Sequence, residues 1–333
     1  MDKLIYFPLP TKSGYGNPYS QNFKDSLTRY YNVLDMEYEN HALQSISLLK
    51  RAFVGDVFIF NWLENVSFWT LGKIQFVVVL LALAVIKKRK AKIVWMLHNI
   101  RPHQGENKMT KFIQKWLFKN ASLIISHSRD ATEYAQTRTT RMVVYRCHPI
   151  KEMPYVDVSK DVEPFDILVW GTILPYKGVL EFLESSYVQK RNLKIKVIGQ
   201  CNDDVLNDKI KALCNDRIVF ENRKIEFSEL RQYVKASKIV LFPYIGDCVS
   251  SSGALIDTIM LKGNPVGPSV GAFKDLAEEG VCFTYSRFED LDELLNCQKL
   301  SNMALDRREI FIQHNSWESF GSFLYDSINK NVI

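Results

Sequence analysis

The sequence lacks the paired cysteines of a disulfide or zinc framework. Its six cysteines are scattered over 333 residues, and no two of them form a CxxC pair. This pattern fits a protein of a reducing compartment. No GxGxxG follows a predicted strand, which counts against a dinucleotide-dependent dehydrogenase. The chain also has no arginine-rich or aromatic RNA-binding motif, so we expect no nucleic-acid partner.

The chain has no obvious membrane-spanning segment. The apolar run Phe76–Ile86 (FVVVLLALAVI) has eleven residues, whereas crossing a bilayer takes about 20. We favour a core helix buried against a sheet. The alternative is an interfacial helix whose basic end, residues 87–90, contacts anionic head groups. Because Met1 leads directly into a strand-like run, we expect no signal peptide. The expected location is cytoplasmic, with peripheral attachment to the inner face of the cytoplasmic membrane as a further option.

The two halves of the chain differ in charge. The first 150 residues carry 21 Lys/Arg and 10 Asp/Glu, a net charge of +11. The remaining residues carry 22 and 27, a net charge of −5, which gives the overall +6. A basic half suggests an anionic partner, for which an anionic membrane surface, a lipid phosphate or a nucleic acid are the general candidates.

Strand and helix patterns alternate along both halves, which predicts parallel sheets with helices on both faces. The polar segment 151–164 (KEMPYVDVSKDVEP) interrupts this alternation. We therefore expect an α/β protein of two doubly wound, Rossmann-like domains, residues 1–150 and 165–333, joined by a linker at 151–164. The C-terminal helices could pack back on the first domain. Ligands of such sheets bind beyond the carboxyl ends of the strands, which here predicts a site facing a cleft between the domains.

The stretch Pro243–Pro268 (PYIGDCVSSSGALIDTIMLKGNPVGP) follows a predicted strand and enters a helix near Gly253. Ser250, Ser251 and Ser252 stand at the start of that helix. Capping of free backbone N–H groups is the simpler interpretation of these serines. The alternative is a phosphate or diphosphate site, because N–H groups, hydroxyls and the positive helix end attract anions together.

A second loop, GTILPYKG, runs from Gly171 at the end of a predicted strand to Gly178 at the start of a helix. Lys177 lies between them and could neutralise a phosphate beside the helix N-terminus. Both loops would open on the same edge of one sheet, so one diphosphate could contact both.

These segments resemble a known family in their order and spacing. PYKGVLEFL, KVIG, FSELRQYVKAS before IVLFPY, and SSSGALIDTIMLKGNPV are similar to the C-terminal domain of GT-B glycosyltransferases, in particular the bacterial family 4 (glycosyl transferases group 1) enzymes. KIVWMLHNIRPH followed by ASLIISHS is similar to the N-terminal half of a branch of that family. The resemblance covers most of the chain.

The resemblance implies a glycosyltransferase (hexosyltransferase) of surface polysaccharide synthesis. It implies a UDP- or GDP-sugar donor as substrate, no cofactor, no metal and retention of configuration at the anomeric carbon. The acceptor would be a glycan or a polyprenyl-diphosphate-linked oligosaccharide, held by the N-terminal domain. By the same resemblance, the catalytic residues are His98 and Lys177, the donor-binding residues are Gly171, Thr172, Lys177, Gly178, Ser250, Ser251, Ser252 and Gly253, and the acceptor-binding residues are Gly14, Gly16, Asn17, Asn99 and His103.

The chain departs from the family pattern at the serine loop. Family members often carry two glutamates eight positions apart, where this sequence has Ser250 and Thr258, or Val249 and Asp257 after a one-residue shift. Asp247 or Asp257 could substitute in part. An arginine common in the preceding loop is also absent. These departures concern the orientation of the donor sugar and the stereochemical outcome.

Two other functions fit parts of the sequence. A nucleotide-sugar epimerase would keep the fold and change the chemistry. A non-catalytic basic protein that binds membranes or nucleic acid would have no affinity for nucleotide sugars. A DxD spelling at Asp290-Leu291-Asp292 lies in an acidic helix start, where carboxylates favour the helix dipole, so we do not predict a metal site there.

Overall fold

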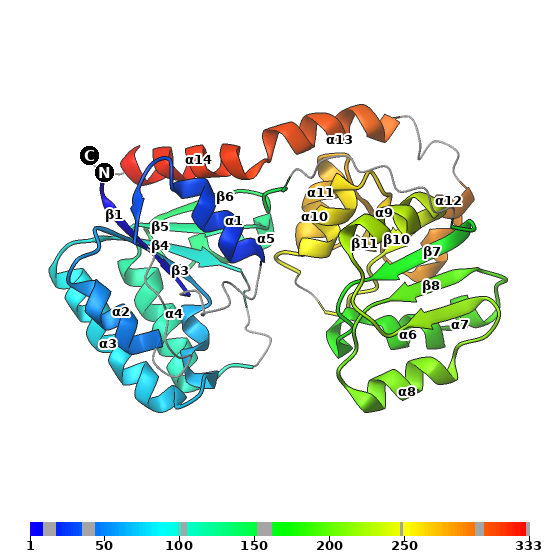
Figure 1. Ribbon diagram of the computed structural model, residues 1–333, viewed down its shortest axis with the longest axis horizontal. Coiled ribbons are helices and arrows are strands. Elements are labelled where there is room, and N and C mark those ends of the chain that lie inside the picture. The colour runs from blue at the N-terminus through cyan, green and yellow to red at the C-terminus, as the bar shows by residue number, and fades with distance from the viewer. Residues whose placement is uncertain are drawn as a thin grey trace. The chain divides into compact units, whose positions relative to one another are not determined.

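The computed structural model describes residues 1–8, 18–34, 44–98, 100, 105–151, 162–246, 249–296 and 303–330. The chain divides into two compact units. Unit 1 comprises Met1–Cys147 and Trp317–Ile333, and unit 2 comprises His148–Ser316. Each unit is built around its own parallel sheet with flanking helices (Figure 1).

The sheet of unit 1 has the strand order β2-β1-β3-β4-β5-β6, and all its pairings are parallel. Helices α2, α3, α4 and α5 cover one face, while α1 and α14 cover the other. The elements are β1 (Lys3–Phe7), α1 (Pro18–Leu27), β2 (Asn32–Val33), α2 (Gln44–Ala52), β3 (Val57–Asn61), η2 (Leu63–Phe68), α3 (Gly72–Lys88), β4 (Lys92–Leu97), α4 (Lys108–Asn120), β5 (Leu123–Ser126), α5 (Arg129–Gln136), β6 (Met142–Tyr145) and α14 (Trp317–Lys330).

The central strands of unit 1 are apolar on both faces, as expected for a parallel sheet between two helical layers. In β3, for example, Phe58 and Phe60 face one core cluster, while Val57 and Ile59 face the other. All four side chains are fully buried. Polar residues at the ends of these strands therefore differ from the apolar residues that fill the strands.

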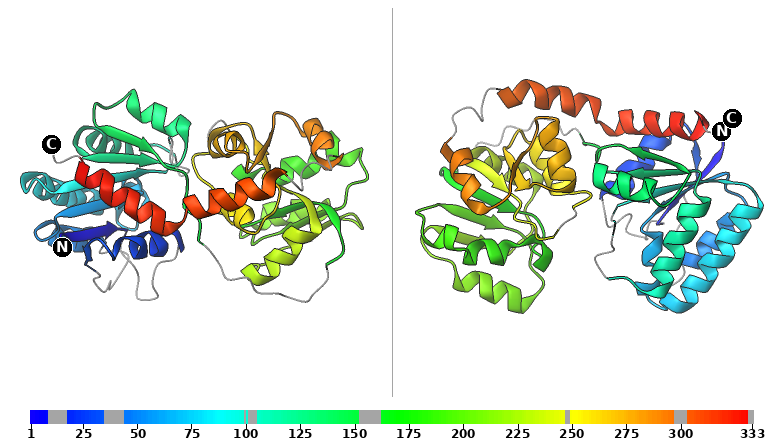
Figure 2. Two further views of the ribbon diagram at one scale, coloured as in Figure 1. Left: turned by 90° about the horizontal axis from the view of Figure 1, so that it is seen from above. Right: turned by 180° about the vertical axis from the view of Figure 1, so that it is seen from behind.

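The last helix, α14, packs against the first helix, α1, although the two are about as far apart in sequence as the chain allows (Figure 2). Phe320 of α14 meets Phe23 of α1 with ring centroids 5.2 Å apart. Trp317 contacts Tyr19 and Phe23 in the same cluster. The C-terminal helix is thus part of the core of unit 1.

Helix α3 contains the apolar run Phe76–Ile86, for which a helix was predicted. A 3-10 turn, η2, precedes it, and Leu71 adopts a left-handed conformation with φ 57°. At Gly72 an added Cβ would lie 2.3 Å from the carbonyl oxygen of Ser67, so the chain reverses tightly there. None of the helices in the part of the chain that the structure describes is long and apolar enough to span a bilayer.

One face of α3 is buried in the core, as the favoured interpretation expects, and the other is exposed. Val79, Leu83 and their neighbours on the buried face have no exposed surface. On the outer face Ile74, Val77 and Leu81 are 61%, 56% and 54% exposed. Their spacing of three and four residues places them along one side of the helix.

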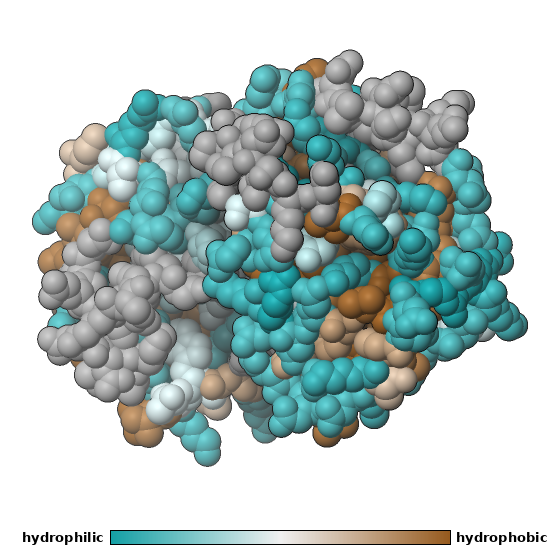
Figure 3. All heavy atoms as spheres, turned by 45° about the vertical axis from the view of Figure 1, so that its right-hand side comes forward, coloured by the Kyte–Doolittle hydropathy of each residue, from teal (hydrophilic) through white to brown (hydrophobic). Residues whose placement is uncertain are grey.

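Unit 2 has a six-stranded parallel sheet with the order β12-β11-β10-β7-β8-β9. The part of its surface that comes forward in Figure 3 is mostly hydrophilic, with hydrophobic side chains in between. Its elements are β7 (Phe165–Trp170), η3 (Pro175–Lys177), α6 (Val179–Glu184), α7 (Ser186–Gln189), β8 (Ile195–Ile198), α8 (Asp204–Ala212), β9 (Ile218–Glu221), α9 (Phe227–Ala236), β10 (Ser237–Leu241), α10 (Gly253–Met260), β11 (Pro265–Pro268), α11 (Gly271–Glu278), β12 (Phe283–Tyr285), η4 (Phe288–Asp290), α12 (Leu291–Asn296) and α13 (Met303–His314).

The contact between α14 and α1 gives a test of stability. Replacing Phe320 by alanine should destabilise unit 1 by about 3–5 kcal/mol, because it leaves a cavity among Phe23, Trp317 and the sheet. Urea unfolding followed by tryptophan fluorescence measures this change. Glu318→Gln on the exposed side of the same helix is the control and should change the unfolding free energy by less than about 0.5 kcal/mol. Equal effects of the two substitutions would show that α14 is not part of the core.

Candidate functional site

Two loops of unit 2 meet at the carboxyl ends of its strands. The loop after β7 and the loop after β10 are joined by a hydrogen bond from the Ile245 N–H to the Tyr176 carbonyl, at 2.9 Å. Gly178 has a left-handed φ of 67°, and a Cβ built on it would lie 2.0 Å from the Pro243 carbonyl oxygen. Only glycine fits this close approach. The contact fixes Lys177, the preceding residue, beside the second loop.

The Lys177 ammonium lies at the end of β7 near the start of α10. A Cβ built on Gly171 would lie 3.6 Å from Lys177 Nζ and 3.8 Å from the Ala254 side chain. The ammonium also sits 5.6 Å from the ring centre of Tyr244, whose face attracts a cation. The predicted residues Lys177 and Gly171 are therefore brought together with the first turn of α10.

Lys177 carries an ammonium that is partly withdrawn from water. Burial lowers its pKa from the usual value of 10.5 to about 8, because the charged form loses hydration. Among the described residues, no carboxylate forms an ion pair with it. A desolvated cation without a counter-ion favours the approach of an anion.

The start of α10 provides backbone donors in the same place. Ser252 caps the helix, and its hydroxyl accepts a hydrogen bond from the Leu255 N–H at 3.3 Å. Capping, the simpler prediction for this serine, is thus confirmed. Ser250 is buried, Ser251 is half-buried and Gly253 is exposed. A Cβ built on Gly253 would meet no atom of the described chain within 4 Å, so the space before this helix end is open.

Two further residues shape this site and were missed in the sequence. The Tyr244 hydroxyl lies 3.2 Å from the Ser252 hydroxyl, which links the aromatic ring beneath Lys177 to the helix cap. Gly199, which follows β8, packs so tightly that a Cβ there would lie 1.8 Å from the Gly171 carbonyl oxygen. Gly171 itself has a φ of 105°. The predicted donor residue Thr172, next to it, is exposed.

The resemblance predicts glutamates at Ser250 and Thr258, or at Val249 and Asp257 after a one-residue shift; of these, Ser250 and Thr258 are buried. Thr258 is fully buried and accepts a hydrogen bond from the Trp170 indole N–H at 2.9 Å. Its hydroxyl donates to the Ala254 carbonyl. Asp257 is half-buried on α10, and burial raises the pKa of its carboxyl from 3.8 to about 7. Asp257 is therefore a carboxyl on this helix that can be protonated near neutral pH.

The two aspartates of the DxD sequence, Asp290 and Asp292, stabilise the local structure through hydrogen bonds and an ion pair. Asp290 accepts hydrogen bonds from the backbone N–H groups of Ser286 and Arg287. Asp292 accepts from the Tyr187 hydroxyl at 2.9 Å and pairs with Arg191. Within the described ranges, no cluster of three or more histidine, cysteine, aspartate or glutamate side chains is placed to hold a metal ion.

In unit 1, His98 follows the end of β4 and is buried. Its Nε2 lies 2.7 Å from Oδ1 of Asn61, the last residue of β3. The Asn61 amide nitrogen donates to the Phe7 carbonyl at 3.4 Å, so its oxygen faces the histidine. His98 therefore carries a proton on Nε2, and Asn61 fixes both the tautomer and the ring orientation.

A second histidine, His127, lies at the end of the neighbouring strand β5. Its Nδ1 donates to the Arg146 carbonyl at 2.7 Å, so its Nε2 accepts a hydrogen bond from the Tyr19 hydroxyl at 2.7 Å. Burial lowers the pKa of His127 to about 4, so it is neutral at physiological pH. The Tyr19 ring contacts both His98 and His127 with centroids 5.1 and 5.7 Å away.

A pocket of about 440 Å³ opens beside this network. Trp62 stacks on His98, with ring centroids 4.4 Å apart, and also lines the pocket. Aromatic faces with amide groups between them are typical of sites that bind sugar rings. The lining residues are Pro8, Gln44, Asn61, Trp62, Phe68, Trp69 and Thr70. The predicted acceptor residues Gly14, Gly16, Asn17, Asn99 and His103 lie outside the described residues.

No protein-family model matches the chain, and no curated protein matches its sequence. Solved structures do match its fold. The crystal structure of Anabaena HepE in complex with UDP-glucose is 13% identical, with a TM-score of 0.74 over 99% of this chain and 100% of that one. Sucrose-phosphate synthase from Thermosynechococcus elongatus is 10% identical, with a TM-score of 0.71 over 99% of both chains.

AviGT4, a glycosyltransferase involved in avilamycin A biosynthesis, is 13% identical, with a TM-score of 0.64 over 99% of this chain and 98% of that one. These structural neighbours are GT-B glycosyltransferases. Full-length coverage on both sides means that the likeness includes both units. The chain therefore has the predicted two-domain α/β GT-B fold.

Proposed function

We propose that the protein is a glycosyltransferase that takes its sugar from a nucleoside diphosphate sugar. The carrying observation is the desolvated Lys177 ammonium beside the open N-terminus of α10. A cation that pairs with no carboxylate of the described residues, next to the N–H groups of a helix start, matches the needs of a diphosphate. UDP-glucose is the first donor to test, since it is bound in the HepE structure. A GDP-sugar is the alternative.

The proposed chemistry is electrostatic. As the acceptor hydroxyl bonds to the anomeric carbon, the bond from that carbon to the β-phosphate oxygen breaks and leaves negative charge on the phosphate. Lys177 and the N–H groups at Ser252–Gly253 stabilise this charge without the need for a metal. The proton of the acceptor hydroxyl passes to a base or to the departing phosphate. We propose that Gly171, Thr172, Gly178, Ser250 and Ser251 complete the donor site.

Unit 1 supplies the acceptor side of the proposal. His98, held by Asn61, would contact the donor sugar or the acceptor hydroxyl. The pocket lined by Trp62 and Trp69 would hold a sugar ring of the acceptor. A glycan or a polyprenyl-diphosphate-linked oligosaccharide fits this lining, and we propose surface polysaccharide synthesis with retention of configuration as the reaction context. Asp257 is the carboxyl we propose in place of the missing glutamates.

We further propose that unit 1 attaches to an anionic membrane surface. The exposed side chains Ile74, Val77 and Leu81 of α3 form an apolar stripe. Lys87 and Lys88 in its last turn are exposed. A stripe of this kind ending in lysines suits the boundary between lipid head groups and acyl chains.

Removing the charge of Lys177 tests the donor site. Lys177→Met should lower kcat/KM by roughly 10²–10³-fold, since one preorganised donor to the leaving group is lost. Initial rates with UDP-glucose measure this, and Lys190→Met on the surface of the same unit is the control. Conversion of UDP-glucose into an isomeric nucleotide sugar in the absence of an acceptor would indicate an epimerase instead. Normal turnover by Lys177→Met would remove the proposed phosphate role.

The same lysine predicts the pH dependence of UDP binding. Below pH 8 the ammonium is charged, so affinity should be constant. Above pH 8 the free lysine loses its proton and binding must take one up, so affinity should fall by up to tenfold per pH unit. Calorimetry between pH 7 and 10 measures this. Lys177→Arg should abolish the dependence, because arginine stays protonated. An unchanged slope in that variant would place the titration elsewhere.

Asn61 should act as a positioning residue for His98. We expect His98→Ala to lower kcat by about 10²-fold or more if His98 moves a proton, and Asn61→Ala to lower kcat by about tenfold through loss of ring orientation. Both variants should bind UDP within twofold of the wild type, because the proposed UDP site lies in unit 2. Gln21→Ala, on an exposed part of α1, is the control. A fall in UDP affinity equal to the fall in kcat would point to a general structural defect.

Vesicle binding tests the membrane proposal. Lys87→Gln with Lys88→Gln should weaken binding to vesicles that contain 30% phosphatidylglycerol by roughly thirtyfold, since each lysine near an anionic surface contributes about 1 kcal/mol. Co-sedimentation at two salt concentrations measures the effect. Lys190→Gln with Lys209→Gln removes the same charge from unit 2 and should bind like the wild type. Equal binding by both double variants would exclude α3 as the contact.

A further inference from the structure

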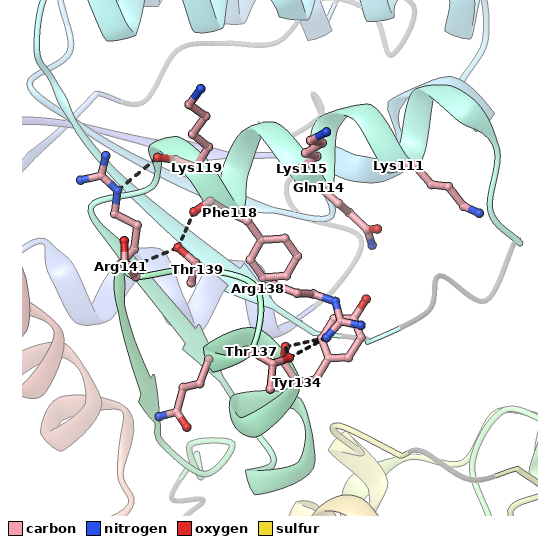
Figure 4. A pocket seen from close by; sticks show the side chains of 12 residues that line it. Lys111, Gln114, Lys115, Phe118, Lys119, Tyr134, Thr137, Arg138, Thr139 and Arg141 are labelled. Carbon is pink, nitrogen blue, oxygen red and sulfur yellow. Dashed lines mark hydrogen bonds between the residues drawn. The ribbon is translucent and has the colours of Figure 1, made fainter.

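A basic groove lies between α4 and the segment that joins α5 to β6 (Figure 4). Its volume is about 840 Å³. It is lined by five cationic side chains and by no carboxylate. The lining residues are Lys111, Gln114, Lys115, Phe118, Lys119, Tyr134, Gln136, Thr137, Arg138, Thr139, Thr140 and Arg141.

The lysines come from a single helix, and their spacing is regular. Lys111, Lys115 and Lys119 are four residues apart on α4, which places them in a row on one side of the helix. Lys111 pairs with Glu106 at 3.3 Å. Within the described part of the chain, no ion pair involves Lys115 or Lys119. The row therefore presents net positive charge along the groove.

The arginines are held in place by contacts that leave their charge unneutralised. Arg141 donates from Nε to the Lys119 carbonyl at 3.1 Å, which ties the end of the groove to α4. Arg138 lies over the Tyr134 ring, 3.5 Å from its centre, and donates to the Tyr134 carbonyl and the Thr137 hydroxyl. Neither arginine pairs with a carboxylate of the described residues. Arginines fixed in this way are preorganised to bind phosphate.

The five cationic side chains are exposed, and Lys111 alone among them has a carboxylate partner in the described part of the chain. Their positive charges act together on an anion that approaches the groove. The groove wall also carries hydroxyl and amide groups, including Thr139 and Gln114, and the apolar ring of Phe118 (Figure 4). Such a mixture suits a ligand that combines several negative charges with a hydroxylated ring.

The groove is separate from the sites proposed above. Arg138 and Arg141 precede β6, so they lie where that strand begins, whereas His98 and His127 follow the ends of β4 and β5. In a parallel sheet all strands begin at one end of the sheet and finish at the opposite end. The aromatic pocket beside Trp62 shares no lining residue with the groove.

We propose that this groove is a binding site for a ligand that carries two or more phosphate groups, either a free sugar bisphosphate or a phosphorylated lipid head group. Lys115, Lys119, Arg138 and Arg141 bind the phosphates. The threonine hydroxyls and Gln114 contact the ring. Binding of this ligand in unit 1 does not depend on Lys177 or on the proposed transfer reaction.

Calorimetry on the full chain tests the site with two soluble probes, inorganic diphosphate and fructose 1,6-bisphosphate. The Lys177→Met background weakens binding at the proposed donor site. Adding Arg138→Gln and Arg141→Gln should weaken Kd at least tenfold, and binding should fall steeply with salt. Arg141→Gln also removes the hydrogen bond to the Lys119 carbonyl. Lys115→Gln with Lys119→Gln is therefore a second variant, which leaves that hydrogen bond in place, and it should show a similar loss.

The matched control is Lys190→Gln with Lys209→Gln, which removes two charges from unit 2 and should leave Kd within twofold. A parallel arm uses phosphatidylcholine vesicles with and without 30% phosphatidic acid. Loss of soluble-probe binding in the groove variants identifies a free phosphorylated ligand, and loss of vesicle binding alone identifies a lipid head group. The proposal is overturned if neither probe nor vesicle binds, or if groove and control variants bind equally.

Discussion

The candidate donor site depends on one backbone contact, the hydrogen bond between Ile245 and Tyr176 that joins the loops after β10 and β7. It holds Gly178 against the Pro243 carbonyl, where no side chain would fit. Lys177 is thereby kept beside Tyr244 and partly shielded from water. Its lowered pKa is a consequence of this packing. The positive charge thus stays near the open end of α10, where one anion can contact both the ammonium and the N–H groups of the helix.

The polar network of unit 1 follows a similar logic at the ends of three adjacent strands. Asn61, His98 and His127 each stand where an apolar strand finishes. Hydrogen bonds to main-chain carbonyls set the orientation of Asn61 and of His127, and these in turn settle where the protons of both histidines lie. Two members of the network are thus oriented by backbone, and His98 is oriented by the Asn61 side chain. Trp62 covers it with an aromatic face that also lines a pocket.

Much of the fold could be predicted from the sequence, and less of the site. The strands ending near Trp170 and Leu241 and the helix that starts at Gly253 were all evident from apolar runs and from glycine and serine at their ends. Gly199 and Tyr244 stand in motifs that the sequence analysis names, but their roles could not be recognised, since these arise from three-dimensional contacts with Gly171 and Ser252. Helices α2 and α11 are difficult to recognise in the sequence because they have only 9 and 8 residues, so their apolar spacing repeats few times.

The sequence by itself determined the two parallel sheets, since alternating apolar strands and amphipathic helices can bury their surfaces in few other ways. It also determined the row of lysines on α4, which follows from helical spacing alone. Only the tertiary structure decided which of these charges share a groove, which histidine is held by Asn61, and that α14 completes the first unit. These features depend on contacts between segments that are distant in sequence, and no local pattern encodes them.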